Sequence, residues 1–502
     1  MSLPRQSDLI CFLIAAGIIL ATSTGLAQTS APASSEASRT FKLIPSLDKE
    51  LMDTAADPCV DFYRYACGNW SKLHPIPNDS PYSDQFYNLE QYNRQVLHEI
   101  LDSAAAGGGG RDSNTQKIGD YYASCMDQAF IQQKATAPLQ PELERINALT
   151  SKDQLPELLA HFQLINVNAF LGFGSQQDFK DATREIAAVS QGGLGLPEKD
   201  YYLRTGEKDE EIRKQYVQHI GNILKLLGAS DAQTSNDSQA IMKLETALAK
   251  VSLDVTSQRD PLGNSFHAAE FESHRQLAKI GKPVNRDEWE MSPPTVNAYY
   301  STSMNDINFP AGVLQSPFFA TLSADALNYG HIGLFMGHEL THGFDDEGRQ
   351  FDGRGNLDDW WTKDDAEKFT EKADCFVNEY GQFSVGDTKL NGKLTLGENA
   401  ADNGGMRLAY MAFLARAAEE SLNLDKKTRT GYTPLQEVFV GFAQDWCAVW
   451  RPELERLIAT TDPHSPDRFR ANGVLVNMPE FAKAFGCKAG QPMVAVKACR
   501  VW

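Results

Sequence analysis

The strongest chemical signal in the sequence is the segment from Gly337 to His342, which reads Gly-His-Glu-Leu-Thr-His. On a helix, His338 and His342 lie one turn apart on the same face, so two imidazole nitrogens can bind one metal ion. Glu339 lies between them and can point toward a water molecule on that metal. The alternative is a pair of surface histidines beside a solvated glutamate. The mostly apolar residues 332–336 favour a buried helix, in which the histidines need partners.

A downstream segment, Gly397 to Asp402, can complete such a metal site. Catalytic zinc usually has three protein ligands and one open position for water. Glu398 and Asp402 are four residues apart on a second predicted helix, so one carboxylate can bind the metal while the other holds the outer nitrogen of a ligand histidine. The alternative is a charge cluster at a helix N-terminus. Together with the two histidines, this segment predicts one Zn²⁺ ion per chain.

Most of the chain that must position these residues shows the apolar spacing of helices. The predicted helices cover residues 88–106, 115–130, 154–164, 209–227, 237–253, 324–344, 364–380, 396–420 and 435–449. Residues 289–319 contain four prolines and several β-type side chains, which favour extended chain and loops. The glycine run 107–110 predicts a surface loop. The expected fold class is therefore mainly α with a small β component (α+β).

Composition sets the broad class of protein. The chain has 502 residues, of which 42% are hydrophobic, and this is too apolar for a disordered protein. Lys and Arg number 47 against 66 Asp and Glu, giving a net charge of −19. Without a long basic run, this charge argues against binding to nucleic acid or to an anionic membrane.

The first 27 residues predict a secretory signal peptide, and residues 28–45 a linker. Arg5 precedes an uninterrupted apolar and small run from Leu9 to Ala21, and small residues precede the expected cleavage after Ala27. This run is shorter than the roughly 20 residues that cross a bilayer. We therefore expect export to the periplasm or the extracellular space, with no stable membrane insertion after cleavage. An uncleaved N-terminal anchor is the alternative.

Export makes the cysteines candidates for disulfides, since bridges persist in oxidising compartments. Eight cysteines are present, and Cys11 leaves with the signal peptide. The remaining seven are an odd number, so at least one is unpaired or pairs between chains. None forms a Cys-x-x-Cys motif, so a cysteine-based zinc site has little support. Buried, inert thiols are the alternative.

Further segments accompany the His-Glu-x-x-His motif in a recognisable order. They are Asp57–Gly68, Tyr121–Asp127 and Gly192–Tyr202 in the first half, and Val296–Tyr300, Phe309–Gln315, Gly343–Asp346, Gly397–Gly405 and Cys499–Trp502 in the second. In this order the chain resembles the neprilysin and endothelin-converting enzyme family of zinc metallopeptidases. The resemblance implies a thermolysin-like catalytic domain over residues 285–502 and a mainly helical cap domain over residues 46–284.

The resemblance also implies roles for individual residues. His338, His342 and Glu398 would hold zinc, Glu339 would be the general base and proton shuttle, and Asp402 the supporting carboxylate. His464 would stabilise the oxyanion. Arg470 would grip the substrate backbone, and Asn297 and Ala298 would bind the peptide main chain along an edge strand. A hydrophobic substrate pocket would be lined by Val313, Phe318, Leu334, Phe335 and Trp446, for which plain core packing is the alternative.

The implied disulfides are Cys59–Cys487, Cys67–Cys447 and Cys375–Cys499, which leave Cys125 without a partner. In the resembling family a stretch about the size of a small domain separates the parts that match residues 257–261 and 263–272, whereas here they adjoin. We therefore expect a truncated cap, with the deletion near residues 261–263. Smaller departures are His331 where the family usually has glycine, Ala400 where it has isoleucine, Asp445 where it has an apolar residue, and Asp467 where glycine is common.

The sequence thus predicts an exported zinc metalloendopeptidase that cleaves peptide substrates on the amino side of bulky hydrophobic residues. A truncated cap would also relax the size limit on substrates. The competing hypothesis is a catalytically inactive truncated member that at most binds peptides.

Overall fold

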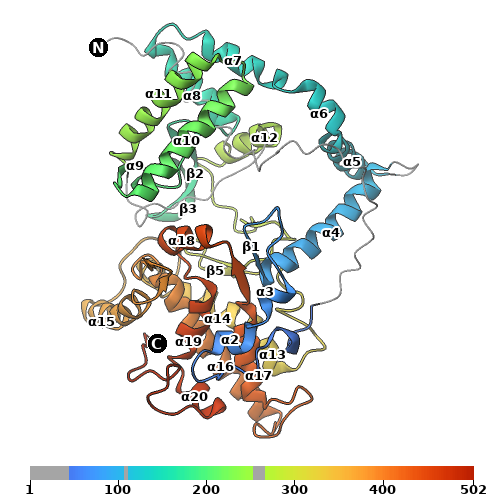
Figure 1. The fold of residues 1–502 in the computed structure, drawn as a ribbon, viewed down its shortest axis with the longest axis vertical. Helices are drawn as coiled ribbons and strands as arrows, with labels where there is room; N and C mark the ends of the chain where they lie inside the picture. The colour runs from blue at the N-terminus through green and yellow to red at the C-terminus, as the bar shows by residue number, and fades with distance from the viewer. Residues whose placement is uncertain (1–43, 107–110, 253–265, 502) are drawn as a thin grey trace. The chain divides into compact units, whose positions relative to one another are not determined.

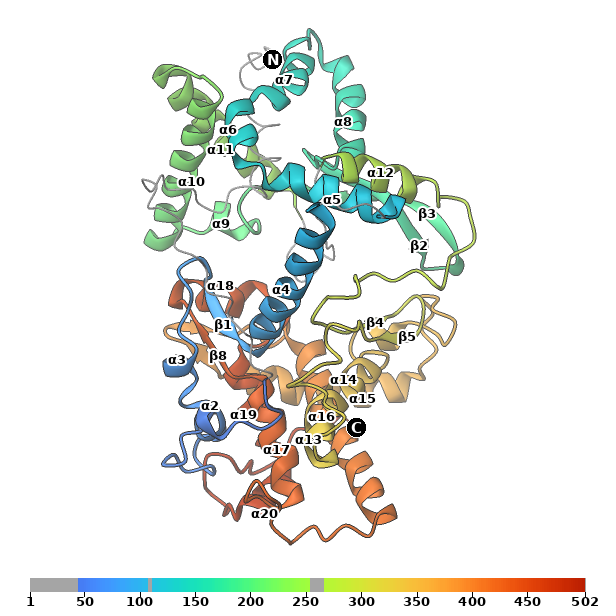
Figure 2. The ribbon, with the colours of Figure 1, turned by 90° about the vertical axis from the view of Figure 1, so that its right-hand side faces the viewer.

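The computed structural model describes residues 44–106, 111–252 and 266–501. The expected signal peptide, almost all of the linker, the glycine run and the expected deletion point near residues 261–263 lie outside the described residues. Helices dominate the described chain, and its strands form four two-stranded sheets (Figures 1 and 2). The expected mainly α class with a small β component is confirmed.

The described residues divide into two compact units. Unit 1 takes in residues 101–178 and 183–284, and unit 2 takes in residues 44–100, 179–182 and 285–501. The sequence-based division placed residues 46–100 in the cap domain, but they pack with the C-terminal half. The physical reason is a shared core, because Phe62, Trp70 and Leu89 belong to the same buried cluster as side chains of residues 313–493.

Unit 1 is helical apart from one hairpin. Its elements are α5 (Ser113–Met126), α6 (Gln128–Lys134), η2 (Ala137–Leu139), α7 (Gln140–Asn147), η3 (Lys152–Gln154), α8 (Leu155–Leu164), β2 (Leu171–Asp178), most of β3 (Asp181–Gln191), α9 (Asp200–Leu203), α10 (Glu207–Leu226), α11 (Asp231–Ala249) and α12 (Phe266–Leu277). The β2–β3 hairpin was not predicted. The helix expected over residues 115–130 is two helices, because the Asp127 carboxylate accepts from the Phe130 amide and caps a new start. Similarly, Ser230 and Gln233 form a capping box that starts α11 earlier than predicted.

Unit 2 contains the predicted metal-binding motifs. Its elements are η1 (Lys49–Leu51), α2 (Phe62–Cys67), α3 (Trp70–Leu73), β1 (Tyr82–Asp84), most of α4 (Gln85–Ala105), β4 (Tyr299–Ser301), β5 (Asp306–Asn308), α13 (Asp325–Gly330), α14 (Ile332–His342), η5 (Gly348–Gln350), α15 (Lys363–Tyr380), β6 (Ser384–Val385), β7 (Thr388–Lys389), α16 (Leu396–Glu419), α17 (Pro434–Asp445), β8 (Ala448–Trp450), α18 (Pro452–Thr461), α19 (Asp467–Leu475) and α20 (Pro479–Phe485).

Two predicted helices of unit 2 are shorter than expected. The helix expected over residues 324–344 is interrupted at His331, which separates α13 from α14. The helix expected over residues 435–449 ends at Asp445, and Ala448–Trp450 instead pairs antiparallel with β1. Both differences depend on partners distant in sequence, which local spacing does not reveal.

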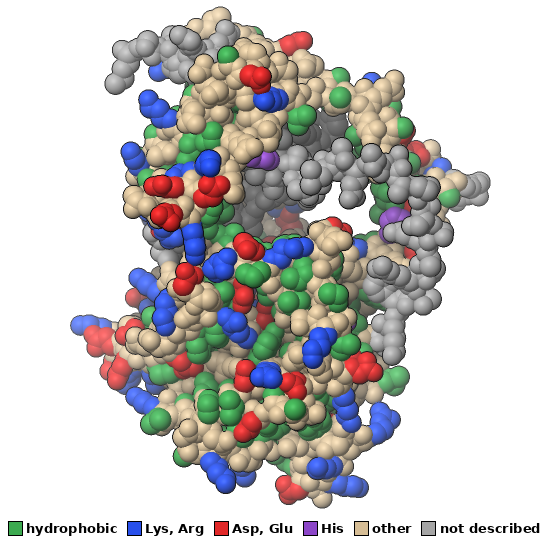
Figure 3. All heavy atoms as spheres, viewed as in Figure 1, with side chains coloured by type: hydrophobic (Ala, Val, Ile, Leu, Met, Phe, Trp, Pro, Cys, Tyr) green, Lys and Arg blue, Asp and Glu red, His purple; other side chains and the backbone are tan. Residues whose placement is uncertain are grey.

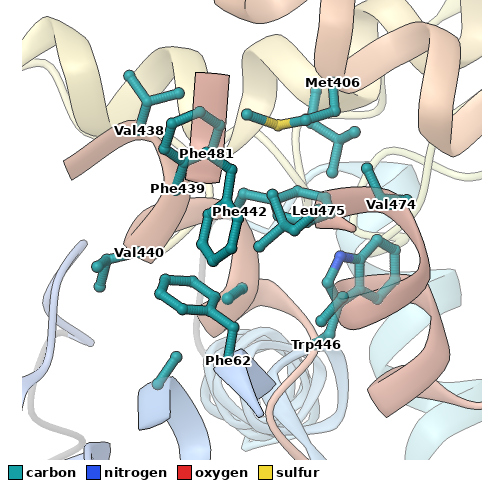
Figure 4. Close-up of a cluster of buried hydrophobic side chains, with 14 of the residues drawn as sticks. Phe62, Met406, Val438, Phe439, Val440, Phe442, Trp446, Val474, Leu475 and Phe481 are labelled. Carbon is teal, nitrogen blue, oxygen red and sulfur yellow. The ribbon is translucent and has the colours of Figure 1, made fainter. Parts of the chain in front are cut away.

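The core of unit 2 brings together the helices that surround the metal-binding motifs. Figure 4 shows aromatic and aliphatic side chains from α2, α16, α17, α19 and α20 meeting in one buried cluster; the labelled side chains are Phe62, Met406, Val438, Phe439, Val440, Phe442, Trp446, Val474, Leu475 and Phe481. Helices α14 and α16 pack against each other through Gly337 and Gly405, where an added Cβ would meet the opposite backbone at 2.6 and 2.5 Å. These glycines therefore set the close approach of the two helices.

The three implied disulfides are present. Cys59 pairs with Cys487, Cys67 with Cys447, and Cys375 with Cys499, whereas Cys125 is free and exposed. Among the described residues, no helix has the length and apolar character that crossing a bilayer requires. Lys and Arg side chains are interspersed with Asp and Glu on the face of the molecule drawn in Figure 3.

Candidate metal centre

Two helices position the predicted zinc ligands. Helix α14 carries His338 and His342 one turn apart, and the first turn of α16 carries Glu398. One ligand atom from each of these residues lies within 4.8 Å of the other two. Their side chains are only 7%, 19% and 16% exposed, respectively. The structure therefore brings together the three groups that the sequence predicted to bind metal.

Each histidine is oriented by a carboxylate on its outer nitrogen. His338 Nδ1 lies 2.8 Å from Asp402 Oδ1, and His342 Nδ1 lies 2.7 Å from Asp345 Oδ2. Because an ionised carboxylate only accepts hydrogen bonds, both Nδ1 atoms carry the proton and donate it. Each Nε2 atom is then left with a free lone pair for a metal.

These lone pairs face one another, and this arrangement fits a bound cation. The two Nε2 atoms lie 3.0 Å apart, and Glu398 Oε2 lies 3.3 Å from that of His338 and 3.8 Å from that of His342. Glu398 Oε2 is buried and has no hydrogen-bond partner among the described residues. Three electron-pair donors so close together repel one another unless positive charge lies between them. Two imidazoles and one carboxylate are a donor set typical of catalytic zinc.

The electrostatics of the site show the same preference for positive charge. Burial alone would raise the pKa of Glu398, but the neighbouring His464, His342 and His338 hold it well below its ordinary value. Burial alone would lower the pKa of His338, but Asp402 and Glu398 raise it to about 10. In the absence of metal the site therefore holds protons, which a divalent cation has to displace.

Glu339 lies beside the ligands on α14 and is only 6% exposed. Burial raises the pKa of its carboxyl above the ordinary value, against the lowering effect of the two histidines. A carboxylate with a raised pKa is suited to accept a proton near neutral pH. The position and environment of Glu339 are therefore those of a candidate general base.

His464 also reaches the metal centre. It lies in the loop between α18 and α19, its side chain is 48% exposed, and its Nε2 is 3.3 Å from Glu398 Oε2. Its Nδ1 lies 2.8 Å from Asp462 Oδ1, and the same oxygen accepts a hydrogen bond from the His464 amide. Asp462 thereby fixes the orientation of the imidazole and leaves its Nε2 directed at the site.

Arg470, on α19, is bound to Asp402 by two hydrogen bonds of 2.7 Å. Its guanidinium also lies 4.0 Å from the centre of the Trp446 ring. The sequence-based role of Arg470 was to grip the substrate backbone. In the structure, two of its donors hold the carboxylate that orients His338, so the residue also supports the metal centre.

The residues predicted to form the hydrophobic pocket lie in the core. Val313, Phe318 and Trp446 are 1%, 0% and 2% exposed, and Leu334 and Phe335 belong to the same cluster. Asn297 and Ala298 come just before β4 and not within it. The Asn297 carboxamide accepts a hydrogen bond from the Ala298 amide. Substrate contact by these residues stays a prediction.

Sequence reasoning gave no role to Asp345 and Asp462, which hold the outer nitrogens of His342 and His464. Asp345 follows His342 by three residues, a spacing that returns a side chain to the same side of a helical turn. Its other oxygen accepts from the amides of Glu347 and Gly348, which anchors the carboxylate. The Asp-x-His spacing of Asp462 and His464 was the corresponding signal in the second case.

Comparison with known proteins decides the family. Models of "Peptidase family M13" match residues 58–285 and residues 297–501, and together these matches cover most of the chain. The chain belongs to peptidase family M13. Endothelin-converting enzyme 1 of Mus musculus is 28% identical and Neprilysin-3 of Drosophila melanogaster 26% identical, each across 90% of this chain and 85% of the relative. The predicted membership of the neprilysin and endothelin-converting enzyme family is confirmed, and with it a peptidase of a zinc-dependent family.

Solved structures show the same family M13 fold. An inhibitor complex of zinc metalloprotease ZMP1 from Mycobacterium tuberculosis matches with a TM-score of 0.83 at 24% identity, covering 92% of this chain and 100% of that one. PEPO from Lactobacillus rhamnosis matches with a TM-score of 0.70 at 19% identity, covering 88% and 98%. The alignment with the mouse enzyme extends over 668 residues, more than the 502 of this chain, so it contains gaps opposite residues that this chain lacks.

Proposed function

We propose that this member of family M13 is an exported zinc endopeptidase that hydrolyses peptides on the amino side of bulky hydrophobic residues. The observation that carries the proposal is the convergence of His338, His342 and Glu398 beside a buried carboxylate, Glu339. Three ligands leave one position of a tetrahedral zinc ion open, as catalytic sites require.

The residues of the chain account for the proton transfers of such a reaction. Bound zinc would supply Lewis-acid chemistry, polarising the scissile carbonyl and making a nearby water more acidic. Glu339 would accept the proton of the attacking water and deliver it to the leaving amine. Its raised pKa suits both steps, because the carboxylate must take the proton and then release it. No serine or cysteine nucleophile is needed.

The other site residues would stabilise charge and fix geometry. His464 Nδ1 donates to Asp462, so an imidazolium His464, which carries a proton on Nε2 as well, would donate a hydrogen bond from Nε2 to the oxyanion as it forms. A donor of this kind contributes about 2.7–4 kcal/mol to the transition state. Asp402 and Asp345 would keep the ligand imidazoles in the tautomer that binds metal, and Arg470 would hold Asp402 in place.

Export is supported by the three disulfides together with the apolar N-terminal segment. Disulfide bridges form and persist in an oxidising compartment. A periplasmic or extracellular location is therefore part of the proposal.

Replacement of Glu339 by Gln tests the mechanism. The variant keeps the size of the side chain and touches no predicted ligand, so we expect its zinc content to equal that of the native protein. We expect kcat/KM on a peptide with an internal hydrophobic residue to fall by at least about 100-fold. Glu371→Gln, at an exposed position of α15, is the matched control and should be as active as the native protein. Equal rates for native protein and Glu339→Gln would contradict the mechanism.

The alternative function is an inactive truncated member that binds peptides. The gaps in the alignment with the mouse enzyme favour it, because residues of that relative have no counterpart in this chain. A zinc-loaded native protein that binds hydrophobic peptides but does not cleave them would establish this alternative.

A further inference from the structure

A buried histidine and aspartate lie at the start of the helix that carries the predicted zinc ligands. His331, between α13 and α14, places its Nδ1 2.5 Å from Oδ1 of Asp445, the last residue of α17. The side chains are 1% and 0% exposed. Both belong to unit 2, and both are positions at which the sequence departs from the resembling family, which has glycine and an apolar residue there. The two departures are therefore partners in space.

The second ring nitrogen of His331 is also engaged. Its Nε2 lies 2.5 Å from the backbone carbonyl oxygen of Ser46. A carbonyl oxygen only accepts hydrogen bonds, so Nε2 must carry a proton. A second proton then lies between Nδ1 and Asp445 Oδ1, since neither atom could otherwise donate to the other. The pair thus shares one proton and has no net charge, whichever atom the proton is nearer.

Two glycines make room for this pair between the helices. A Cβ added to Gly441 would lie 3.1 Å from His331 Nε2, so the glycine leaves room for the ring on α17. A Cβ on Gly330 would lie 2.3 Å from the Val438 carbonyl oxygen, which brings α13 against α17 just before the histidine. Figures 1 and 2 both show α13 beside α17. Burial disfavours charge on both partners, yet Asp445 holds the pKa of His331 above its ordinary value.

Each residue of the pair is connected to the metal centre. His331 directly precedes α14, whose next turns carry Glu339 and the two ligand histidines. Asp445 directly precedes Trp446, whose ring lies under the guanidinium of Arg470, and Arg470 holds Asp402. Asp402 in turn orients His338. The pair therefore holds the start of the helix that carries the ligand histidines. It also holds the residue next to Trp446, from which contacts run through Arg470 and Asp402 to His338.

We propose that His331 and Asp445 are positioning residues, a proton-sharing pair that fixes α14 against α17 and the segment around Ser46 and so holds the zinc ligands in place. The proposal rests on the proposed function for its effect on hydrolysis, but its effect on zinc affinity stands without turnover. Neither residue touches the metal site itself.

A double-mutant cycle on the full-length protein tests the proposal. The variants are His331→Gly, Asp445→Val and the two together, which return both positions to the residue types of the resembling family. Either single change leaves a buried polar group without its partner. The double change removes both members of the pair and leaves only the carbonyl of the partly exposed Ser46 without its donor. We expect each single variant to lose at least about tenfold in zinc affinity and in kcat/KM, and the double variant to stay within about threefold of the native protein.

Asp445→Asn separates the shared proton from packing. The carboxamide keeps the shape of the carboxylate but cannot share a proton. With its NH2 turned toward Nδ1, it can donate to a neutral imidazole whose Nε2–H still donates to Ser46. We therefore expect Asp445→Asn to bind zinc within about threefold of the native protein, whereas Asp445→Val, which leaves His331 Nδ1 without a partner, loses at least about tenfold. We also expect the native protein to show a strongly downfield imidazole N–H resonance that is absent from all four variants.

The outcomes separate this proposal from the proposed function. Zinc affinity is measured by chelator competition, and the resonance by NMR, so both are decided even if the native protein hydrolyses no peptide. A single variant that fails to fold while the double variant folds supports the pair. The proposal is overturned if the native protein lacks the resonance, if Asp445→Val binds zinc like the native protein, or if the double variant loses as much as the two single variants combined.

Discussion

At the scale of the residue, the metal centre depends on which nitrogen of each histidine carries the proton. Asp345 fixes this choice for His342, because its Oδ2 accepts from Nδ1 while its Oδ1 accepts from two backbone amides. In Asp345→Asn, the amide oxygen can keep the backbone contacts, but the amide nitrogen then faces Nδ1 and requires an acceptor there. The neutral imidazole of His342 would then carry its proton on Nε2, and this nitrogen would no longer have a lone pair for the metal.

We therefore expect Asp345→Asn to bind zinc about 10- to 100-fold more weakly than the native protein, with the fold retained. Competition with a chromogenic chelator measures the affinity, and circular dichroism measures the fold. Asp374→Asn, at an exposed position of α15, is the matched control. Unchanged zinc affinity in Asp345→Asn would show that the hydrogen bond does not select the tautomer.

At the scale of the element, the ligands of α14 and α16 meet because the two helices approach closely at a pair of glycines. A Cβ on Gly405 would lie 2.5 Å from the His338 amide nitrogen and 2.8 Å from the Leu334 carbonyl oxygen. Both neighbours are backbone atoms, so the helices must move apart to admit a methyl group. Such a movement separates Glu398 from the two histidines, which lie on the other helix.

Gly405→Ala should therefore destabilise the protein by about 1–3 kcal/mol and weaken zinc binding, although alanine is the better helix former. Denaturant unfolding and chelator competition measure the two effects. Gly353→Ala is the matched control, because nothing lies within 4 Å of a Cβ placed there. Equal stability of the two variants would mean that the helices tolerate the wider spacing.

Helix α15 contains a partly buried carboxyl, that of Glu379, whose ionisation affects the stability of the protein. Burial raises the pKa of Glu379 from 4.5 to about 7, against the effect of its hydrogen bond from Asn477. The folded state then binds more protons than the unfolded state between these values, so the free energy of unfolding falls as the pH rises from about 4.5 to about 7. Above about pH 7, the free energy of unfolding is lower by the full amount, up to about 3 kcal/mol.

Glu379→Gln removes this loss while keeping an oxygen that can accept from Asn477. We expect the variant to be more stable than the native protein near pH 8 and equally stable near pH 4. Denaturant unfolding at both pH values gives the difference in unfolding free energy between the variant and the native protein. The contributions of the other titrating groups cancel in this difference. A pH-independent difference would mean that packing and not ionisation distinguishes the two proteins.

Local sequence pattern was sufficient for some elements and insufficient for others. The zinc-ligand helix could be predicted because His338, Glu339 and His342 carry both the chemistry and the helical spacing within six residues. The pairing of β1 with β8 and of His331 with Asp445 could not, because each joins residues far apart in the chain. The break at His331 is set by that distant partner, whereas the local apolar pattern continues through it. The implied disulfides were available only through resemblance to a family.

At the scale of the whole molecule, two disulfides join the N-terminal segment of unit 2 to its C-terminal part. Cys59–Cys487 and Cys67–Cys447 close loops of 428 and 380 residues, so they strongly restrict the unfolded chain. Residues 46–100 contribute side chains such as Phe62, Trp70 and Leu89 to the core of unit 2, and the two bridges join this segment to the C-terminal part of the unit. Oxidation and folding of this unit are therefore coupled, and this coupling connects its stability to the compartment.

The thiol content of the protein tests this connection. Exported, mature protein should contain one titratable thiol, that of Cys125, because the other six cysteines are paired. The same chain made in a reducing cytosol without residues 1–27 should contain seven thiols and should lose about 2–5 kcal/mol of stability for each missing bridge. Cys125→Ala controls for exchange through the free thiol, and should leave no titratable thiol in the exported form. If cytosolic protein matched the exported form in stability while fully reduced, the core of residues 46–100 would hold without the bridges, and the disulfides would no longer support export.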